Sequence, residues 1–240
     1  MKTSKILTFI IMFLLMSSCV DAQFYRTVRG NGNVVRKERP ASYFDGVRVS
    51  TGIDVYLSQG DKEAIIVEAD ENLHEYIVTD VKEGVLRIYY DNVNIRDAER
   101  TRVYVTMKDV RSLKTSSAGD IIGETPVKCG DIRLESSSAG NIQLDLYARN
   151  VEVRISSSGD VKLTGEAESL EADLSSAGDL NAYNFKVKDA TVNVSSAGDA
   201  EIFVTHKLTA HASSAGDILY SGNPEFIDAR SSSAGKIRKK

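Results

Sequence analysis

The most regular feature of this sequence is a two-residue alternation of apolar and polar side chains in its C-terminal half. Val151, Val153 and Ile155 alternate with Glu152 and Arg154. The same rhythm recurs at Leu170–Leu174, Ala190–Val194, Leu208–Ala212 and Ile227–Ser231. Successive side chains of a β-strand point to opposite faces, so each segment is predicted to be a strand with one buried face.

Each of these segments runs into a copy of one pentapeptide, Ser-Ser-Ala-Gly-Asp or a close variant. Its seven glycines are Gly119, Gly140, Gly159, Gly178, Gly198, Gly216 and Gly235, which lie 21, 19, 19, 20, 18 and 19 residues apart. Alternation resumes after each copy, as at Val161 and Leu163. A period near 20 residues predicts an all-β, parallel β-helix-like solenoid over residues 111–240, whose rungs bury their apolar faces only against one another.

The pentapeptide is expected to be the corner of each rung. Glycine at its fourth position is predicted to take a positive φ, which a residue with a Cβ resists. The following residue is expected to fix the bend, and it is Asp120, Asn141, Asp160, Asp179, Asp199 or Asp217. Stacked rungs would bring these carboxylates into one row, where hydration or a bound calcium ion would relieve their repulsion.

The second serine of each copy is in phase with the buried residues. These serines are Ser117, Ser138, Ser157, Ser176, Ser196, Ser214 and Ser233. A buried hydroxyl without a partner is costly. The sequence therefore predicts an internal serine ladder, in which each hydroxyl bonds its neighbour one rung away.

Residues 43–110 contain apolar segments that predict strands without the regular period. Ser50-Thr51-Gly52-Ile53-Asp54 echoes the corner, so this part is also read as a decorated start of the solenoid. Because a solenoid needs atypical ends that cover its core and strand edges, residues 43–110 are expected to form an N-terminal β cap. Residues 23–42 are expected to be a flexible leader.

The N-terminus has the pattern of a secretory signal over residues 1–22. Lys2 and Lys5 precede an apolar run from Ile6 to Met16, which is too short to span a bilayer. Cleavage before Cys19, with lipidation of that cysteine, is the preferred reading. Cleavage after Ala22 is the alternative. Cys129 would then be the only other cysteine, so an intrachain disulfide is not expected.

Composition excludes several classes of function. A formal charge of −4 and a pI near 5.5 argue against nucleic-acid binding. No nucleophile elbow, phosphate loop or dinucleotide fingerprint is present, and His74, His206 and His211 have no metal-ligand spacing. No catalytic, cofactor or metal site is therefore expected. A polysaccharide-acting β-helix enzyme would need sugar-stacking aromatics; Tyr147, Tyr183, Phe185, Phe203 and Tyr220 could supply a stripe, although core placement is preferred.

The blocks Phe44-Asp45-Gly46-Val47 and Asp54-Val55-Tyr56-Leu57, followed by the repeated corners, resemble the auto-transporter adhesin, head GIN domain family. Gly140-Asn141-Ile142 spells the family's triplet, and Gly119-Asp120-Ile121 is a variant. The resemblance spans roughly residues 43–236 and implies a right-handed parallel β-helix-like fold in exported bacterial proteins, with no assigned activity. Fold alone does not give function.

These observations favour a non-enzymatic, adhesin-like binding protein of the bacterial cell envelope. Its ligand is expected to be a protein or a glycan, and its contact with the membrane only an N-terminal lipid. A scaffolding periplasmic lipoprotein, which could form homo-oligomers through an open solenoid end, is the main alternative.

Overall fold

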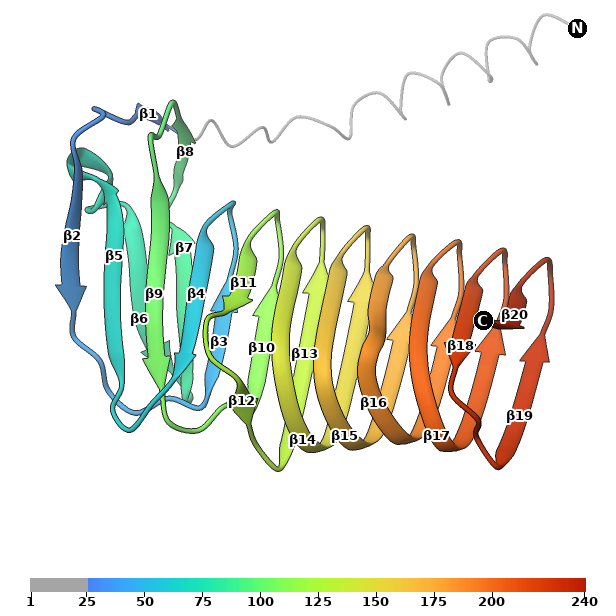
Figure 1. Cartoon of the computed structure of the whole chain (residues 1–240). Coiled ribbons are helices and arrows are strands. Elements are labelled where there is room, and N and C mark those ends of the chain that lie inside the picture. The colour runs from blue at the N-terminus through green and yellow to red at the C-terminus, as the bar shows by residue number, and fades with distance from the viewer. Residues whose placement is uncertain (1–25) are drawn as a thin grey trace, which may run out of the picture.

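The computed structural model describes residues 26–240, and these are almost entirely β-structure (Figure 1). The strands are β1 (Arg26–Arg29), β2 (Val34–Arg39), β3 (Gly46–Val49), β4 (Asp54–Gln59), β5 (Ala64–Asp70), β6 (Ile77–Lys82), β7 (Val85–Tyr90), β8 (Val93–Arg96), β9 (Thr101–Met107), β10 (Ser112–Thr115), β11 (Asp120–Gly123), β12 (Val127–Lys128), β13 (Asp131–Ser137), β14 (Asn141–Ser156), β15 (Asp160–Leu174), β16 (Asp179–Val194), β17 (Asp199–Ala212), β18 (Asp217–Ser221), β19 (Phe226–Ser231) and β20 (Lys236–Lys239). A single 3-10 turn, η1 (Glu71–Leu73), lies between β5 and β6. No helix within residues 26–240 is long and apolar enough to cross a membrane.

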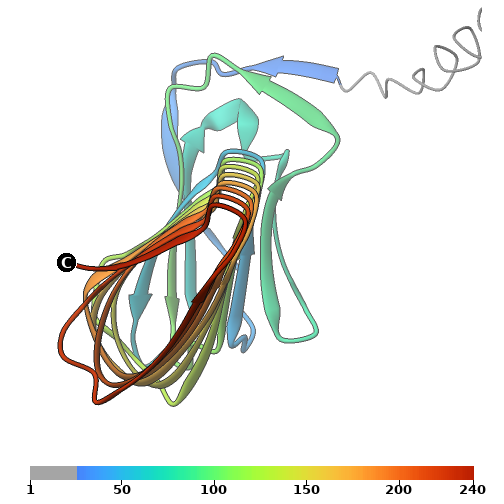
Figure 2. The same ribbon diagram turned by 90° about the vertical axis from the view of Figure 1, so that its right-hand side faces the viewer.

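The predicted solenoid is confirmed as a stack of parallel rungs. Face A, which we define as the strands that precede the corners, runs in the order β7, β3, β10, β13 and then the C-terminal halves of β14 to β17, ending at β19. Face B follows the corners and runs from β4 and β11 through the N-terminal halves of β14 to β17 to β18 and β20. Viewed along the stack, the corners lie over one another (Figure 2).

The rungs enclose one continuous apolar core. Its members alternate along each strand as the sequence predicts; Val151, Val153 and Ile155 are each at most 2% exposed. Leucine, isoleucine and valine fill most of the interior, and Ala172, Ala182, Ala190, Ala200 and Ala210 occupy the narrower places. Burial of this apolar surface, together with main-chain pairing between rungs, stabilises a chain that has no disulfide within residues 26–240.

The solenoid begins before residue 111. Strands β3 and β4 flank the corner-like segment at Gly52 and pair in parallel with β10 and β11. These two strands therefore belong to the parallel stack. Next to these strands, β5 pairs antiparallel with both β2 and β9, and β6 pairs antiparallel with β7.

The expected flexible leader at residues 23–42 was wrong for its described part. Strand β1 pairs with β8, and β2 pairs antiparallel with β5. Buried Glu68 ties β2 down, because it accepts hydrogen bonds from Arg36 Nη2 at 2.8 Å, Arg100 Nη1 at 3.0 Å and Tyr104 Oη at 3.0 Å. Burial alone would raise the pKa of Glu68, but the hydrogen bonds from Arg100, Arg36 and Tyr104 hold it below its usual value. Because β2 is rich in charged residues, the sequence alone did not predict this pairing.

The corner is a tight turn whose backbone differs from the expected one. The residues with positive φ are the second serine and the following alanine, for example Ser176 at 53° and Ala177 at 59°, and not the glycine. Gly178 N–H donates to Ser175 C=O at 3.1 Å and closes the turn. Two consecutive left-handed residues within an i to i+3 hydrogen bond define a type I′ turn.

The glycine is needed for space and not for its φ. A Cβ placed on Gly178 would lie 2.7 Å from Ile155 Cγ2 and 3.1 Å from the Ile155 carbonyl carbon, one rung below. Real Cβ atoms essentially never lie within 3.0 Å of another heavy atom, so Ile155 would have to shift. Glycine therefore lets successive corners come together at the distance that main-chain pairing requires.

The predicted serine ladder was wrong. Ser117, Ser138, Ser157, Ser176, Ser196, Ser214 and Ser233 are all exposed, because the turn begins at these residues and breaks the strand's alternation. They do form a ladder along the stack, but through their main-chain carbonyls: Ala177 N–H donates to Ser196 C=O at 3.1 Å, and equivalent bonds join the other corners. The buried position before the turn carries Thr115 and Ser136 in the early rungs and apolar side chains in those that follow.

The residues after the glycines form the predicted row. Asp54, Asp120, Asn141, Asp160, Asp179, Asp199, Asp217 and Lys236 are consecutive partners in the parallel register. Burial, reinforced by the charges of Asp160 and Asp199, raises the pKa of Asp179. Asn141 relieves the row locally, since its side-chain amide donates to Asp120 Oδ1 at 2.7 Å.

Substitution of Gly178 by alanine should destabilise the protein by about 1–3 kcal/mol, because the added methyl group overpacks against Ile155. Chemical denaturation would measure this loss. Gly130→Ala is the matched control, as its Cβ would meet only the flexible end of Arg149 at 3.5 Å. Ala177→Gly should cause no loss, because glycine accepts the left-handed conformation. Equal stability of the Gly178 and Gly130 variants would contradict the packing argument.

Asp179→Asn should raise the melting temperature at pH 7, because the ionised form of Asp179 is disfavoured in the folded protein. When folding raises the pKa of a carboxyl group, the resulting loss of folding stability is complete above the raised pKa. This loss disappears as the pH falls below the ordinary pKa of the group. The gain should therefore shrink on acidification. Asn141→Asp is the reciprocal variant and should lower the melting temperature. Thermal melts between pH 3 and pH 8 would test both variants, because this range includes the ordinary carboxyl pKa of about 4.

Candidate functional site

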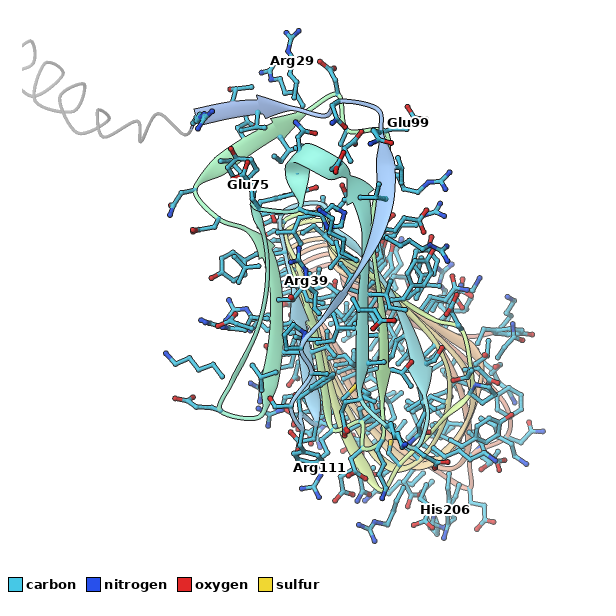
Figure 3. The ribbon with its side chains drawn as sticks, turned by 90° about the vertical axis from the view of Figure 1, so that its left-hand side faces the viewer. Arg29, Arg39, Glu75, Glu99, Arg111 and His206 are labelled. Atoms are coloured by element: carbon cyan, nitrogen blue, oxygen red, sulfur yellow. The ribbon has the colours of Figure 1, made fainter. Side chains whose placement is uncertain are left out.

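The histidines do not form a reactive centre. His74 is buried, its Nε2 lies 3.1 Å from Val35 C=O, and burial lowers its pKa. His206 Nδ1 lies 2.6 Å from Asp189 Oδ1, and the His206 and Phe226 rings pack in a T-shaped arrangement. In Figure 3, His206 lies far from Glu75, the residue next to His74. Within residues 26–240 no serine hydroxyl hydrogen-bonds to a histidine, and no group of three or more His, Cys, Asp or Glu is arranged to hold a metal ion.

Cys129 carries a free thiol. It is half-buried, and burial, assisted by the charge of Asp131, raises its pKa to about 11. The thiolate is the nucleophilic form of cysteine, so this side chain is poorly suited to covalent chemistry near neutral pH.

The five aromatic residues considered for a stripe do not form one surface. Phe185 is fully buried, whereas Tyr147 and Tyr183 are 39% and 37% exposed, and Phe203 and Tyr220 lie between these extremes. A different pair, Tyr56 and Tyr104, stacks with ring centroids 5.3 Å apart on face B. Arg102 and Arg36 lie over these rings, so the pair is engaged by its own neighbours.

A groove lies on the outer side of face A, where the β6–β7 hairpin meets the first rungs. Its volume is about 490 Å³, and its lining includes outward side chains of β3, β7, β10 and β13, together with Lys82 at the end of β6 and the turn residue Glu83. This size is within the range of small-ligand sites. In Figure 2 the β6–β7 hairpin stands beside the stack and forms one wall of this region.

The groove is positively charged although the whole chain is acidic. Arg48, Lys82, Arg87, Lys114 and Arg133 line it, against Glu83 and Glu135. The register places Arg48 directly between Arg87 on one neighbouring strand and Lys114 on the other. All three occupy the outward positions of their strands, since their sequence neighbours Val47, Leu86 and Leu113 are buried.

Two of these three cations are already paired. Arg87 Nε donates to Asp80 Oδ1 at 3.1 Å, and Lys114 forms an ion pair with Glu135. The hydrogen bond from Lys114 holds the pKa of Glu135 below its usual value. The side chain of Arg48 has neither a hydrogen bond nor an ion pair with another residue in the 26–240 range, and it is therefore available to a ligand.

The groove continues along the stack. A second hollow of about 400 Å³ shares Arg133 with it, and a third of about 370 Å³ shares Lys114 and Glu135. Polar side chains such as Asn150, Glu152 and Ser169 line the second, while Arg154, Asp173 and Ser175 contribute to the third. The three hollows together form a depression that extends over several strands of face A, with its cationic end at the hairpin.

Sequence reasoning did not single out this groove. The residues that the sequence singled out are those of the corners and Cys19. The corner residues are structural, and Cys19 lies outside the described residues. Alternation alone indicates that Arg48 and Lys114 point outward. Their adjacency depends on the register of strands that are separated by irregular segments, and no regular spacing in the sequence reveals it.

Comparison with known proteins identifies the family. The family model described as “Putative auto-transporter adhesin, head GIN domain” matches residues 43–224. No curated protein matches the sequence.

Three solved structures share the fold. A “putative adhesin” of Bacteroides fragilis has 20% sequence identity and a TM-score of 0.82, and the match covers 89% of this chain and 100% of that one. A “putative lipid binding protein” of Parabacteroides distasonis has 25% identity and a TM-score of 0.75, with 90% and 100% covered. A “putative adhesin” of Parabacteroides merdae has 22% identity and a TM-score of 0.72, with 90% and 99% covered.

The family match covers most of the chain, and it agrees with the motifs and with the fold. It supports an adhesin-like role at an exported or cell-surface location. The chain belongs to the putative auto-transporter adhesin, head GIN domain family.

Proposed function

We propose that this protein is an exported, non-catalytic binding module of the bacterial cell envelope that engages its ligand through the groove on face A. The observation that carries the proposal is the extended groove with the unpaired side chain of Arg48 at its hairpin end, on a protein of an adhesin family. Residues 43–110 would act as the N-terminal cap, so the groove would lie where cap and solenoid meet.

A binding role suits the rigidity of the scaffold. Outward side chains of face A are held at fixed positions by parallel pairing, so a repeating ligand can be contacted at several rungs. The first hollow of the groove places no histidine or cysteine beside a serine, and Glu83 and Glu135 are the two carboxylates of that hollow, of which Glu135 is engaged by Lys114. These features support binding over bond cleavage.

Display at the envelope would follow from the N-terminal signal. Lipidation at Cys19 would tether the solenoid to a membrane, whereas cleavage after Ala22 would release it. A scaffold in the periplasm would carry the same signal, so location discriminates between an adhesin and a scaffold.

Wild-type protein should sediment with membranes and should be degraded when intact cells are treated with external protease. Cys19→Ser should release it to the soluble fraction, because the lipid attachment point is lost. Cys129→Ser is the matched control and should not change the distribution. Immunoblotting of cell fractions before and after protease treatment provides the measurement. Protection from protease in intact cells would contradict surface display and favour the periplasmic scaffold.

A further inference from the structure

The cationic row at the head of the groove is unfavourable for the isolated protein. Neighbouring strands lie about 4.8 Å apart, and like charges directly opposite each other on one face of a sheet destabilise it. Arg48 has such a neighbour on each side, Arg87 and Lys114. The carboxylates of Asp80 and Glu135 compensate the outer two cations, and no carboxylate in the described chain compensates the central one.

We infer that this groove binds a linear acidic glycan, with a carboxylate or sulfate group of the glycan placed against Arg48. The inference rests on the proposed binding function and adds the chemical class of the ligand. The guanidinium of Arg48 offers two parallel N–H donors, a geometry that matches planar carboxylates and sulfate oxygens. Lys82 at the tip of the hairpin adds a second cation from the opposite wall.

The shape of the depression favours a chain over a small anion. The second and third hollows each adjoin the first and extend it along the stack to β15. The second lies at the start of the face A segments, at Asn150 and Ser169, and the third lies near the corners, at Asp173 and Ser175. Beyond the cationic end their lining combines the amide of Asn150 and several serine hydroxyls with carboxylates such as Glu171 and Asp173. This part suits the hydroxyl groups of sugar units, so the acidic group of the glycan belongs at the Arg48 end. Arg133 and Arg154 in this part are engaged with Glu152, at 2.8 Å each.

The location of the groove favours a glycan over a peptide or a lipid. Extended peptides are recognised mainly through the free main chain of an edge strand, but β3, β10 and β13 each pair with a neighbour on both sides. An acyl chain would need an apolar slot, whereas Val47 and Leu113, which lie at the groove floor, are 1% exposed.

Titration calorimetry of the purified full-length protein with a defined oligogalacturonate, a sulfated oligosaccharide and a neutral cello-oligosaccharide of equal length tests the inference. At least one acidic chain should bind, more weakly as NaCl is raised, and the neutral chain should not. Arg48→Gln should weaken binding about tenfold or more, the effect expected for loss of a charged hydrogen-bonded pair. Arg230→Gln is the matched control, because Arg230 is exposed in the same outward row but on the last strand of face A.

The Arg48→Gln variant should also melt at the same temperature as the wild type or slightly higher, because it removes a like-charge contact. Equal affinity of the Arg48 and Arg230 variants would overturn the site, and binding of the neutral chain alone would overturn the ligand class. Preferential binding to anionic phospholipid vesicles with none to acidic glycans would also overturn it, in favour of a lipid headgroup. Calorimetry with purified protein does not depend on where the protein resides in the cell. A negative calorimetry result would therefore contradict the ligand class, whereas a negative protease result would contradict the location.

Discussion

The structure depends on main-chain hydrogen bonds that run lengthwise from one rung to the next, through the corners as well as through the strands. At each corner the distance between rungs is limited by the glycine, whose missing Cβ leaves room for the backbone of the neighbouring rung. The same bonds hold the second serine and the alanine in left-handed conformations that cost about 1–2 kcal/mol per residue in isolation. The strain is tolerated because every copy is supported by its neighbours.

Exact repetition has an electrostatic consequence. When equivalent residues stack in register, a charge that occurs once per rung becomes a row of like charges, as at the aspartates after the corner glycines. Asn141 and the ion pair between Asp217 and Arg238 interrupt that row. The cationic row at Arg87, Arg48 and Lys114 on face A also follows from parallel register, although these three residues are not copies of one repeat position. The repulsion between the charges of such a row is either reduced by other groups of the protein or left to be neutralised by a ligand.

The site that results lies at a junction and not within the regular repeats. The central rungs present alternating charges on face A, for example Glu135, Arg154 and Asp173, which are consecutive partners in the register. Only where the irregular N-terminal strands join the stack do three cations meet without alternating with carboxylates. The hairpin of β6 and β7 adds the wall that turns this part of the face into a groove. The regular part of the molecule thus supplies rigidity, and the irregular part supplies recognition.

The sequence by itself determined the solenoid, its period and the identity of its buried strand residues, because a two-residue alternation and a repeated corner are local patterns that read directly as strands and turns. It also indicated the family. The prediction for the corner was wrong, because the rung below decides whether a glycine is needed for a positive φ or for close approach. The second serines lie outside the core, because the turn begins at these residues.

The pairing of β2 with β5, the clamp at Glu68 and the adjacency of Arg48 with Arg87 and Lys114 were decided only by tertiary structure. These contacts join segments that are separated by 20 or more residues without a regular spacing, so no local pattern encodes which residues become neighbours.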